Sequence, residues 1–252
     1  MKLNELKVIV TGGASGMGRC FALELARAGA QVVVADMDDD KMAETASQGE
    51  GRVHTIKCNV ADEASVVAMV EQAHAKMGGL NGLVNNAGIF RDGLLVKQDK
   101  ETGAIKKMSL DQWNAVIAVD LTGPFLCTRE FAAKMISTGT KQSCIVNISS
   151  VARHGNPGQS NYSAAKAGLV ADTKLWAQEL ARYGVRVGAI APGFVDTPIL
   201  QGMRPDVLEG MLKGVPLRRA GKPEEIYTAV KFILECDYFT GRCIDVDGGL
   251  SM

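Results

Sequence analysis

The sequence predicts an α/β protein in which helices cover both faces of a doubly wound parallel sheet of seven strands. One observation is that short runs rich in Val and Ile alternate with longer amphipathic segments along the chain. Another is that these runs are apolar on both faces, as the strands of a parallel sheet covered on both sides must be. A third is the glycine-rich turn at residues 11–18, which directly follows the first run and begins the first helix.

The expected elements alternate in order along the chain. The runs predicted as strands cover residues 7–12, 31–36, 53–60, 82–88, 144–150, 185–193 and 243–249. The segments predicted as helices cover residues 18–28, 64–77, 109–136, 163–183 and 223–234. No internal repeat, low-complexity tract or linker rich in Pro and Ser interrupts them, so we expect residues 1–252 to form a single domain.

Two segments do not fit this alternation. Residues 90–108 are polar and place a Glu-Thr-Gly turn between two short alternating runs, which is typical of a surface hairpin or of solvated surface. Residues 197–221 follow a Pro-Gly bend, carry Met and Gly, and are expected to form a long loop. Such loops often act as mobile flaps over a binding site, and a packed connector is the alternative.

Composition and charge exclude several classes of protein. The 28 basic and 28 acidic side chains leave no basic excess, which argues against nucleic-acid binding. Apolar runs stay shorter than a bilayer requires, and the chain enters a strand at once, without a secretory leader. The six cysteines lack CxxC spacing and the three histidines form no ligand pair, so no metal site is expected. We therefore expect a cytoplasmic protein without membrane or nucleic-acid partners.

The glycine-rich turn has the spacing GxxxGxG, formed by Gly12, Gly16 and Gly18. Glycines allow the backbone to approach a pyrophosphate whose charge rests on the N-terminus of the next helix, although tight turns need glycine in any case. The second strand ends in Asp36, 18 residues after Gly18, where a carboxylate can bind the ribose hydroxyls of a dinucleotide. The alternative is that Asp36 caps a helix. Turn and acid together predict a dinucleotide site.

Tyr162 and Lys166 are spaced i and i+4 on a predicted helix, which places both on one helical face. A free tyrosine has a pKa near 10, and a neighbouring ammonium favours the phenolate and so lowers that pKa. The preceding strand ends at Ser149 and Ser150, on the carboxyl edge of the sheet where ligands of open α/β sheets bind. A serine hydroxyl there can donate to a substrate carbonyl, and the alternative is a turn or cap.

These motifs, with Asn85–Gly88 (NNAG) and Ala191–Gly193 (APG), resemble those of the short-chain dehydrogenase/reductase family in order and spacing over essentially the whole chain. The resemblance implies a Rossmann-type fold, one dinucleotide-binding and catalytic domain, a nicotinamide cofactor and a homotetramer. It implies Tyr162 as general acid/base, Lys166 on the nicotinamide ribose and Ser150 on the substrate oxygen. The cofactor residues that it implies are Gly12, Ser15, Gly16, Met17, Gly18, Asp36, Asn59, Val60, Asn86, Ala87, Gly88, Tyr162, Lys166, Pro192, Gly193, Val195 and Thr197.

Two details refine this resemblance. Relatives that prefer NADP carry a basic residue before the second motif glycine or after the second strand, where this chain has Ser15 and Met37. With Asp36 also present, we expect NAD(H) as the cofactor. The family usually has an active-site Asn seven residues after a Trp, and Trp113 plus seven gives Asp120. We expect Asp120 either to keep the proton-relay role of that Asn or to perturb Lys166 through its carboxylate.

The sequence around Tyr162 is similar to the 3-oxoacyl-acyl-carrier-protein reductase branch of the family. That similarity implies reduction of a 3-oxoacyl thioester in fatty-acid metabolism, with acyl carrier protein as a candidate partner. Enzymes of that branch generally prefer NADPH, which Asp36 disfavours. The alternatives are an NAD-dependent dehydrogenase of a small secondary alcohol and a catalytically weak NAD-binding module.

Overall fold

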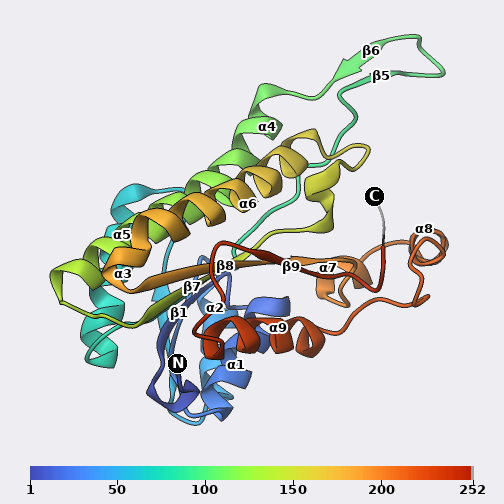
Figure 1. Ribbon diagram of the computed structural model, residues 1–252. Coiled ribbons are helices and arrows are strands. Elements are labelled where there is room, and N and C mark those ends of the chain that lie inside the picture. Colours follow the sequence, from blue (N-terminus) through green and yellow to red (C-terminus); the bar gives the residue numbers. More distant parts are fainter. Residues whose placement is uncertain (251–252) are drawn as a thin grey trace.

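The computed structural model describes residues 1–250. Its main sheet has seven parallel strands in the order β3-β2-β1-β4-β7-β8-β9, which confirms the predicted fold class (Figure 1). The order reverses between β1 and β4, so the carboxyl ends of these two strands form the switch point where ligands of such sheets bind. The strands are β1 Lys7–Thr11, β2 Gln31–Asp36, β3 Val53–Lys57, β4 Gly82–Asn85, β7 Ser143–Ile148, β8 Val185–Pro192 and β9 Cys243–Val246.

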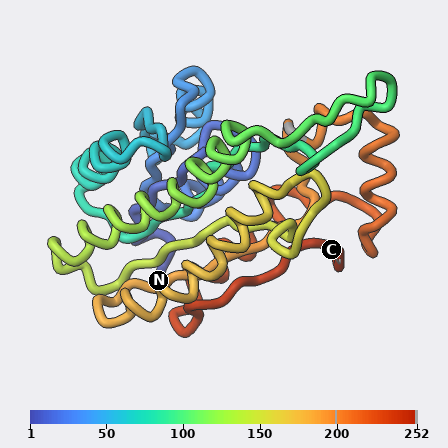
Figure 2. The backbone as a smooth tube through the Cα atoms, turned by 90° about the horizontal axis from the view of Figure 1, so that it is seen from above, coloured from blue at the N-terminus to red at the C-terminus, as the bar shows by residue number. Residues whose placement is uncertain are grey.

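Helices cover both faces of this sheet, as Figure 1 and the view from above in Figure 2 show. On one face lie α1, α2 and α9, and on the other lie α3, α5 and α6. The helices are α1 Gly16–Arg27, α2 Asp39–Ser47, α3 Glu63–Met77, α4 Leu110–Ile117, α5 Gly123–Ser137, α6 Ser160–Leu180, α7 Pro198–Gln201, α8 Pro205–Leu212 and α9 Pro223–Glu235. Within the described chain, no helix is both long and apolar enough to cross a bilayer.

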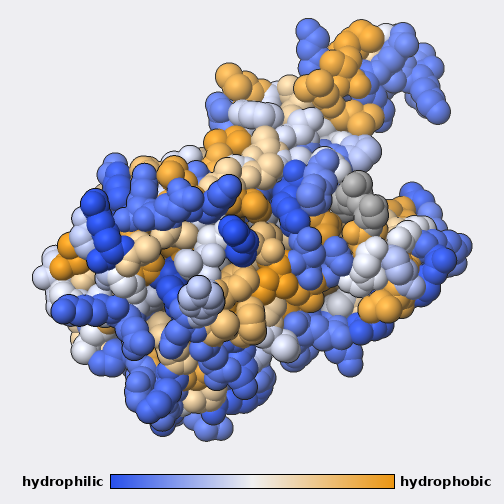
Figure 3. Space-filling model, in the orientation of Figure 1, coloured by the Kyte–Doolittle hydropathy of each residue, from blue (hydrophilic) through white to orange (hydrophobic). Residues whose placement is uncertain are grey.

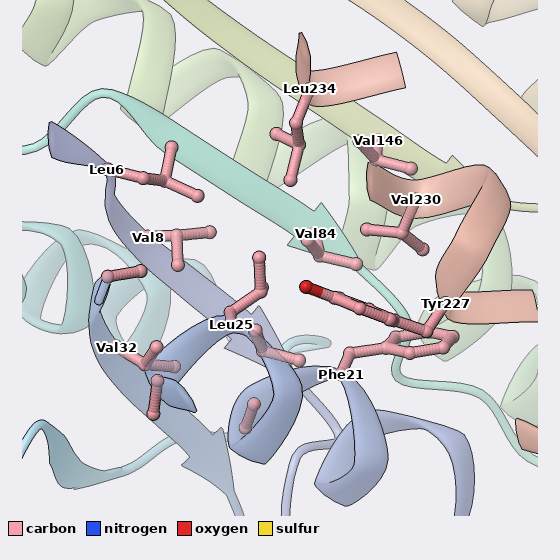
Figure 4. Packing of buried hydrophobic residues seen from close by; sticks show 14 of the residues in the cluster. Leu6, Val8, Phe21, Leu25, Val32, Val84, Val146, Tyr227, Val230 and Leu234 are labelled. Atoms are coloured by element: carbon pink, nitrogen blue, oxygen red, sulfur yellow. The ribbon is translucent and has the colours of Figure 1, made fainter. Parts of the chain in front are cut away.

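Alternation along the strands divides the core into two layers. Val8 and Val10 of β1 pack toward α1 and α9, whereas Ile9 packs toward the opposite helices. Phe21 and Leu25 of α1 are fully buried, and each such side chain contributes about 1.5–3 kcal/mol. Figure 4 shows the first layer, with Leu6, Val8, Phe21, Leu25, Val32, Val84, Val146, Tyr227, Val230 and Leu234 labelled.

The helix predicted over residues 109–136 is not continuous. It consists of α4, a π-helical turn η2 (Ala118–Thr122) and α5. Gly123 N donates to Ala118 O, five residues earlier, and Pro124 has no N–H with which to reach the carbonyl of Asp120. The prediction of one regular helix is therefore wrong at the turn that contains Asp120.

Two further predictions need correction. Residues 39–47 form α2, which the sequence reading did not include among its helices. Residues 197–221 are not only loop, because α7 and α8 form within them, each with Pro in its first turn. Proline suits a first helical turn, since the N–H it lacks has no partner there. The ends of this segment are joined, with Asp196 N donating to Gly221 O and Gly221 N to Phe194 O, both at 2.8 Å.

Residues 90–108 form the predicted hairpin, in which β5 (Val96–Gln98) pairs antiparallel with β6 (Ile105–Lys107). We call residues 94–108 the arm, because they project away from the body of the molecule (Figures 1 and 2). Every residue of its two strands is exposed, and the orange atoms on the projection in Figure 3 reflect its apolar side chains. These are Leu94, Leu95, Val96 and Ile105.

Candidate active site

A cavity of about 760 Å³ opens at the carboxyl edge of the sheet. Each of the first six strands of the sheet, in chain order, contributes a residue at or just beyond its end, and these line one continuous space. All the residues predicted for the cofactor and for catalysis line it, except Gly18 and Asp120. The six strand-end residues are Gly12, Asp36, Asn59, Asn86, Ser150 and Gly193.

The glycine-rich turn lines one end of this cavity. Gly12 and Gly16 have φ of +63° and +53°, a conformation that side-chain-bearing residues adopt at a cost. A Cβ on Gly12 would lie 2.8 Å from Ala87 Cα, so β1 and β4 approach too closely there for any side chain. A Cβ on Gly18 would lie 2.1 Å from Gly12 O, so Gly18 allows close packing beneath the turn and does not line the cavity.

Asn86 joins the turn to the end of β4. Its Nδ2 donates to Thr11 O and Gly12 O at 3.0 and 3.1 Å. The backbone N–H groups of Asn86 and Ala87 both donate to Thr11 Oγ1 at 3.1 Å. These bonds hold the two strand ends at the switch point in one fixed arrangement.

Asp36 ends β2 at the same end of the cavity and does not cap α2. The N-cap of α2 is Asp38, whose carboxylate accepts from Lys41 N at 3.0 Å. Asp36 instead accepts from Ala14 N at 3.1 Å and from Met37 N at 2.7 Å. The carboxylate is therefore held by backbone groups, and its residue is half-buried on the cavity wall.

Tyr162, Lys166 and Ser150 meet at the other end of the cavity. Lys166 Nζ lies 5.3 Å from the centroid of the Tyr162 ring and donates to Ile148 O at 3.1 Å. Ser150 Oγ accepts from Ala152 N at 3.1 Å, which leaves its O–H free to donate toward the cavity. Ser149 is buried, and its Oγ donates to Lys166 O at 2.9 Å, so it supports the helix that carries Lys166.

Asp120 is brought to Lys166 by the π-helical turn. Its Oδ2 lies 3.1 Å from Lys166 Nζ, and its Oδ1 accepts from Ile89 N at 2.9 Å. The residue is 0% exposed and Lys166 is 4% exposed, so this ion pair is withdrawn from water. A Cβ on Gly88 would lie 2.8 Å from Asp120 Oδ2 and 3.6 Å from Lys166 Nζ, so only glycine leaves room for the pair.

The pKa values at this end of the cavity reflect burial and the ion pair together. Burial raises the pKa of Asp120, and Lys166 opposes that rise. Burial lowers the pKa of Lys166, but Asp120 and then Tyr162 outweigh burial and hold it above its ordinary value. Burial raises the pKa of Tyr162, with Lys166 lowering it and Asp120 raising it. Asp120 therefore favours the charged form of Lys166 and opposes the effect of Lys166 on the pKa of Tyr162.

The sequence reading missed the residues just after β4. The Phe90 ring lies against the Tyr162 ring, with centroids 4.7 Å apart and planes at 35°. Asn161 Nδ2 donates to Arg91 O and Gln112 O at 3.1 and 3.0 Å, which ties this segment to the start of α6. The only signal available was their position after the NNAG motif, and nothing in the local pattern indicated which residue would meet the tyrosine.

Side chains from the segment 197–221 also line the cavity. Met203 lines it just before α8, Met211 lines it from within α8, and Leu200 lines it from α7. Arg153 is occupied by an ion pair with Asp245, 2.7 Å between Nη1 and Oδ1. The cavity therefore combines apolar side chains such as Phe90, Leu200 and the two methionines with polar ones, which include Asp92 and the hydroxyls of Ser150 and Tyr162.

Comparison with known proteins agrees with this geometry. A family model described as Enoyl-(Acyl carrier protein) reductase matches residues 12–251. The chain is 40% identical to a 3-oxoacyl-[acyl-carrier-protein] reductase of Thermotoga maritima, over 99% of both chains, and 40% identical to one of Synechocystis, over 97% of this chain and 96% of the relative. It is 36% identical to the (3R)-3-hydroxyacyl-CoA dehydrogenase of Canis lupus familiaris, over 100% of this chain and 98% of the relative. The chain belongs to the short-chain dehydrogenase/reductase family and is an oxidoreductase that uses a nicotinamide cofactor and acts on CH–OH donors.

Proposed function

We propose that the protein transfers a hydride between NAD(H) and a 3-oxoacyl/3-hydroxyacyl thioester. The observation that carries this proposal is the juxtaposition in one cavity of Asp36 and the glycine-rich turn at one end with Ser150, Tyr162 and Lys166 at the other. The relatives named for 3-oxoacyl-acyl-carrier-protein and 3-hydroxyacyl-CoA support the thioester class.

The cavity fits a dinucleotide. Gly12 packs against Ala87 with no room for a side chain, and the N-terminus of α1 at Gly16 lines the cavity beside it. A pyrophosphate is stabilised at such a helix terminus. We assign the adenosine ribose to Asp36, the adenine to Asn59 and Val60, and the nicotinamide side to Pro192, Gly193, Val195 and Thr197. The remaining predicted cofactor residues, except Gly18, line the space between. An additional phosphate on the ribose would face the carboxylate of Asp36, which supports NAD(H) over NADP(H).

The catalytic end supplies the proton chemistry. When bound, the nicotinamide supplies the hydride for carbonyl reduction and accepts it in the reverse reaction. Ser150 donates a hydrogen bond to the carbonyl oxygen, which orients the carbonyl and stabilises the developing charge. Tyr162 transfers its proton to that oxygen, and in the reverse direction its phenolate removes the proton of the alcohol. Lys166 donates to Ile148 O and forms an ion pair with Asp120, and we assign its remaining donor capacity to the nicotinamide ribose.

The substrate end supports an acyl chain. Phe90, Leu200 and the two methionines of the segment 197–221 give apolar walls, and thioether side chains adapt to chains of different shape. We propose that residues 197–221 act as a substrate flap, because their ends are joined by hydrogen bonds while their middle covers the cavity. We also propose that residues 1–252 act as one domain and assemble as a homotetramer, and acyl carrier protein is the candidate carrier of the substrate.

The test is a comparison of substrates at fixed NADH. Acetoacetyl-CoA and free acetoacetate carry the same reacting carbonyl, and only the first carries the thioester. We expect kcat/KM to be far higher for acetoacetyl-CoA, measured as loss of NADH absorbance. Equal rates on both, or faster oxidation of small secondary alcohols with NAD, would contradict the thioester assignment and favour an alcohol dehydrogenase. No turnover of any of them would favour an NAD-binding module.

A further inference from the structure

The buried ion pair of Asp120 and Lys166 bears on which direction of the reaction, carbonyl reduction or alcohol oxidation, the enzyme catalyses faster. Among residues 1–250, Asp120 is the carboxylate in contact with Lys166, and its buried Oδ2, 3.1 Å from Lys166 Nζ, has no hydrogen-bond partner. Its place is fixed by the π-helical turn, by Ile89 N and by the absence of a side chain at Gly88. Single π turns within helices are often found at functional sites.

The charges that face Tyr162 come from three elements. Lys166 lies one turn further along α6, Asp120 lies on η2, and Asp92 lies at the base of the arm. The hydroxyl of Ser150, after β7, also faces the phenol. Formally these groups are one cation and two anions, so the field of a lone ammonium does not act on the phenol. Tyr162, Lys166 and Asp120 are all buried, so water screens the charges of this pair poorly, whereas Asp92 is exposed and its charge is screened.

We propose that Asp120 is a positioning residue that offsets the charge of Lys166, so that Tyr162 enters turnover as a neutral proton donor and the enzyme favours carbonyl reduction at neutral pH. This inference rests on the proposed function. In reduction the O–H bond of Tyr162 breaks, and the proton goes to the carbonyl oxygen as the carbon receives the hydride of NADH. The phenolate then remains beside Lys166 until solvent returns a proton. Oxidation of the alcohol needs the phenolate at the start, and this form is scarce until the pH is alkaline.

The direction of the pKa shift agrees with the geometry. Burial raises the pKa of Tyr162 above its ordinary value, and Lys166 opposes that rise while Asp120 and Asp92 add to it. Replacing Asp120 by the neutral isostere Asn removes the buried anion and leaves the ammonium of Lys166 opposed by the exposed Asp92 alone. The pKa of Tyr162 should then fall, and the phenolate should become available at lower pH.

The test is the pH dependence of kcat in both directions for the wild type and Asp120→Asn, with acetoacetyl-CoA and 3-hydroxybutyryl-CoA as substrates. We expect the alkaline midpoint for oxidation to fall by about one pH unit in Asp120→Asn, with oxidation at neutral pH rising up to about tenfold. The control is Asp245→Asn, which breaks the ion pair with Arg153 and should leave the midpoint unchanged. A profile of Asp120→Asn that is lowered equally at every pH would overturn the proposal and show a purely structural role.

A second measurement does not depend on the folding of that variant. Tyrosinate absorbance is titrated in the wild type and in Tyr162→Phe, and the difference reports Tyr162 alone. We expect the difference to appear above pH 10, the ordinary value for tyrosine. A difference that appears near neutral pH would overturn the proposal, while turnover of the thioester would still stand. Absence of turnover by the wild type in either direction would instead contradict the proposed function.

Discussion

Asp36 and Asp120 lie at opposite ends of the catalytic cavity, and their surroundings differ in kind. Asp36 is half-buried on the cavity wall and receives backbone N–H groups, so its negative charge faces whatever ligand occupies that end. Asp120 is fully buried, does not line the cavity and faces the ammonium of Lys166. The two environments support different proposed roles, in which Asp36 selects the cofactor and Asp120 offsets the charge of Lys166 beside Tyr162.

The largest effect on kcat should come from removing the hydroxyl of Tyr162. This change should leave cofactor binding at the Asp36 end of the cavity unaltered. Tyr162→Phe keeps the ring that packs on Phe90 but lacks the hydroxyl. We expect kcat to fall by about 10²–10⁴-fold, the usual contribution of a general acid. The Kd for NADH, measured by quenching of protein fluorescence or by calorimetry, should stay within about twofold of the wild type. Loss of NADH binding together with turnover would show that the two ends are not separable.

A large effect on stability should follow from breaking the buried ion pair on one side. Lys166→Met preserves much of the side-chain volume but leaves the Asp120 carboxylate buried without its partner. We expect a loss of about 3–5 kcal/mol in the free energy of unfolding, measured by urea denaturation. The double variant Lys166→Met with Asp120→Asn removes both charges and should recover a large part of that loss. Equal destabilisation by the single and double variants would mean that the pair is not coupled.

A smaller effect, on kcat/KM, should come from replacing Asp36 at the other end of the cavity. Asp36→Ala removes the acceptor for the ribose hydroxyls and the repulsion of a ribose phosphate. We expect kcat/KM with NADH to fall by about tenfold or more, since a hydrogen bond to a charged group contributes about 1.5–3 kcal/mol. The kcat/KM with NADPH should rise. Opposite changes for the two cofactors would exclude a general loss of folded protein. Asp38→Ala is the matched control, because it removes the cap of α2 and should cost about 1 kcal/mol of stability without changing the preference.

The smallest effect, on both stability and activity, should come from shortening the arm. Met108 N donates to Leu95 O at 3.1 Å, so residues 96–107 can be replaced by an Asn-Gly turn that joins these two residues. Every residue of β5 and β6 is exposed, and we expect the free energy of unfolding to change by no more than about 0.5 kcal/mol, with kcat unchanged. Thermal denaturation and steady-state rates measure both. A marked loss of stability would show that the arm packs against a second copy of the chain.

The strands of the sheet and most of the helices that cover it followed from local patterns, because apolar runs and amphipathic periods are properties of consecutive residues. The same holds for Tyr162 and Lys166, which one helical turn brings together on α6. The hairpin at residues 90–108 was also predicted, since its turn residues are local. These are features in which neighbours in sequence are neighbours in space.

The remaining features depend on residues that are distant in sequence. The apolar period of residues 109–136 runs through the π turn, so the period alone does not show that Asp120 is displaced toward Lys166. The packing of Phe90 on Tyr162 depends on the route of the chain after β4. Ser149 and Ser150 differ in role because the Ser149 hydroxyl donates to Lys166 O on α6, whereas Ser150 Oγ accepts from Ala152 N. Only the folded arrangement decides which of the two hydroxyls contacts α6.

The proposed role of Asp36 is tested most directly by kcat/KM for acetoacetyl-CoA reduction with NADH and with NADPH, measured side by side on the unmodified protein. Asp36 facing the adenosine ribose predicts that NADH is used more efficiently, because the ribose phosphate of NADPH would meet the carboxylate. Activity with NADPH alone would contradict this, since it would mean that Asp36 turns away from the ligand and serves only the backbone groups around it.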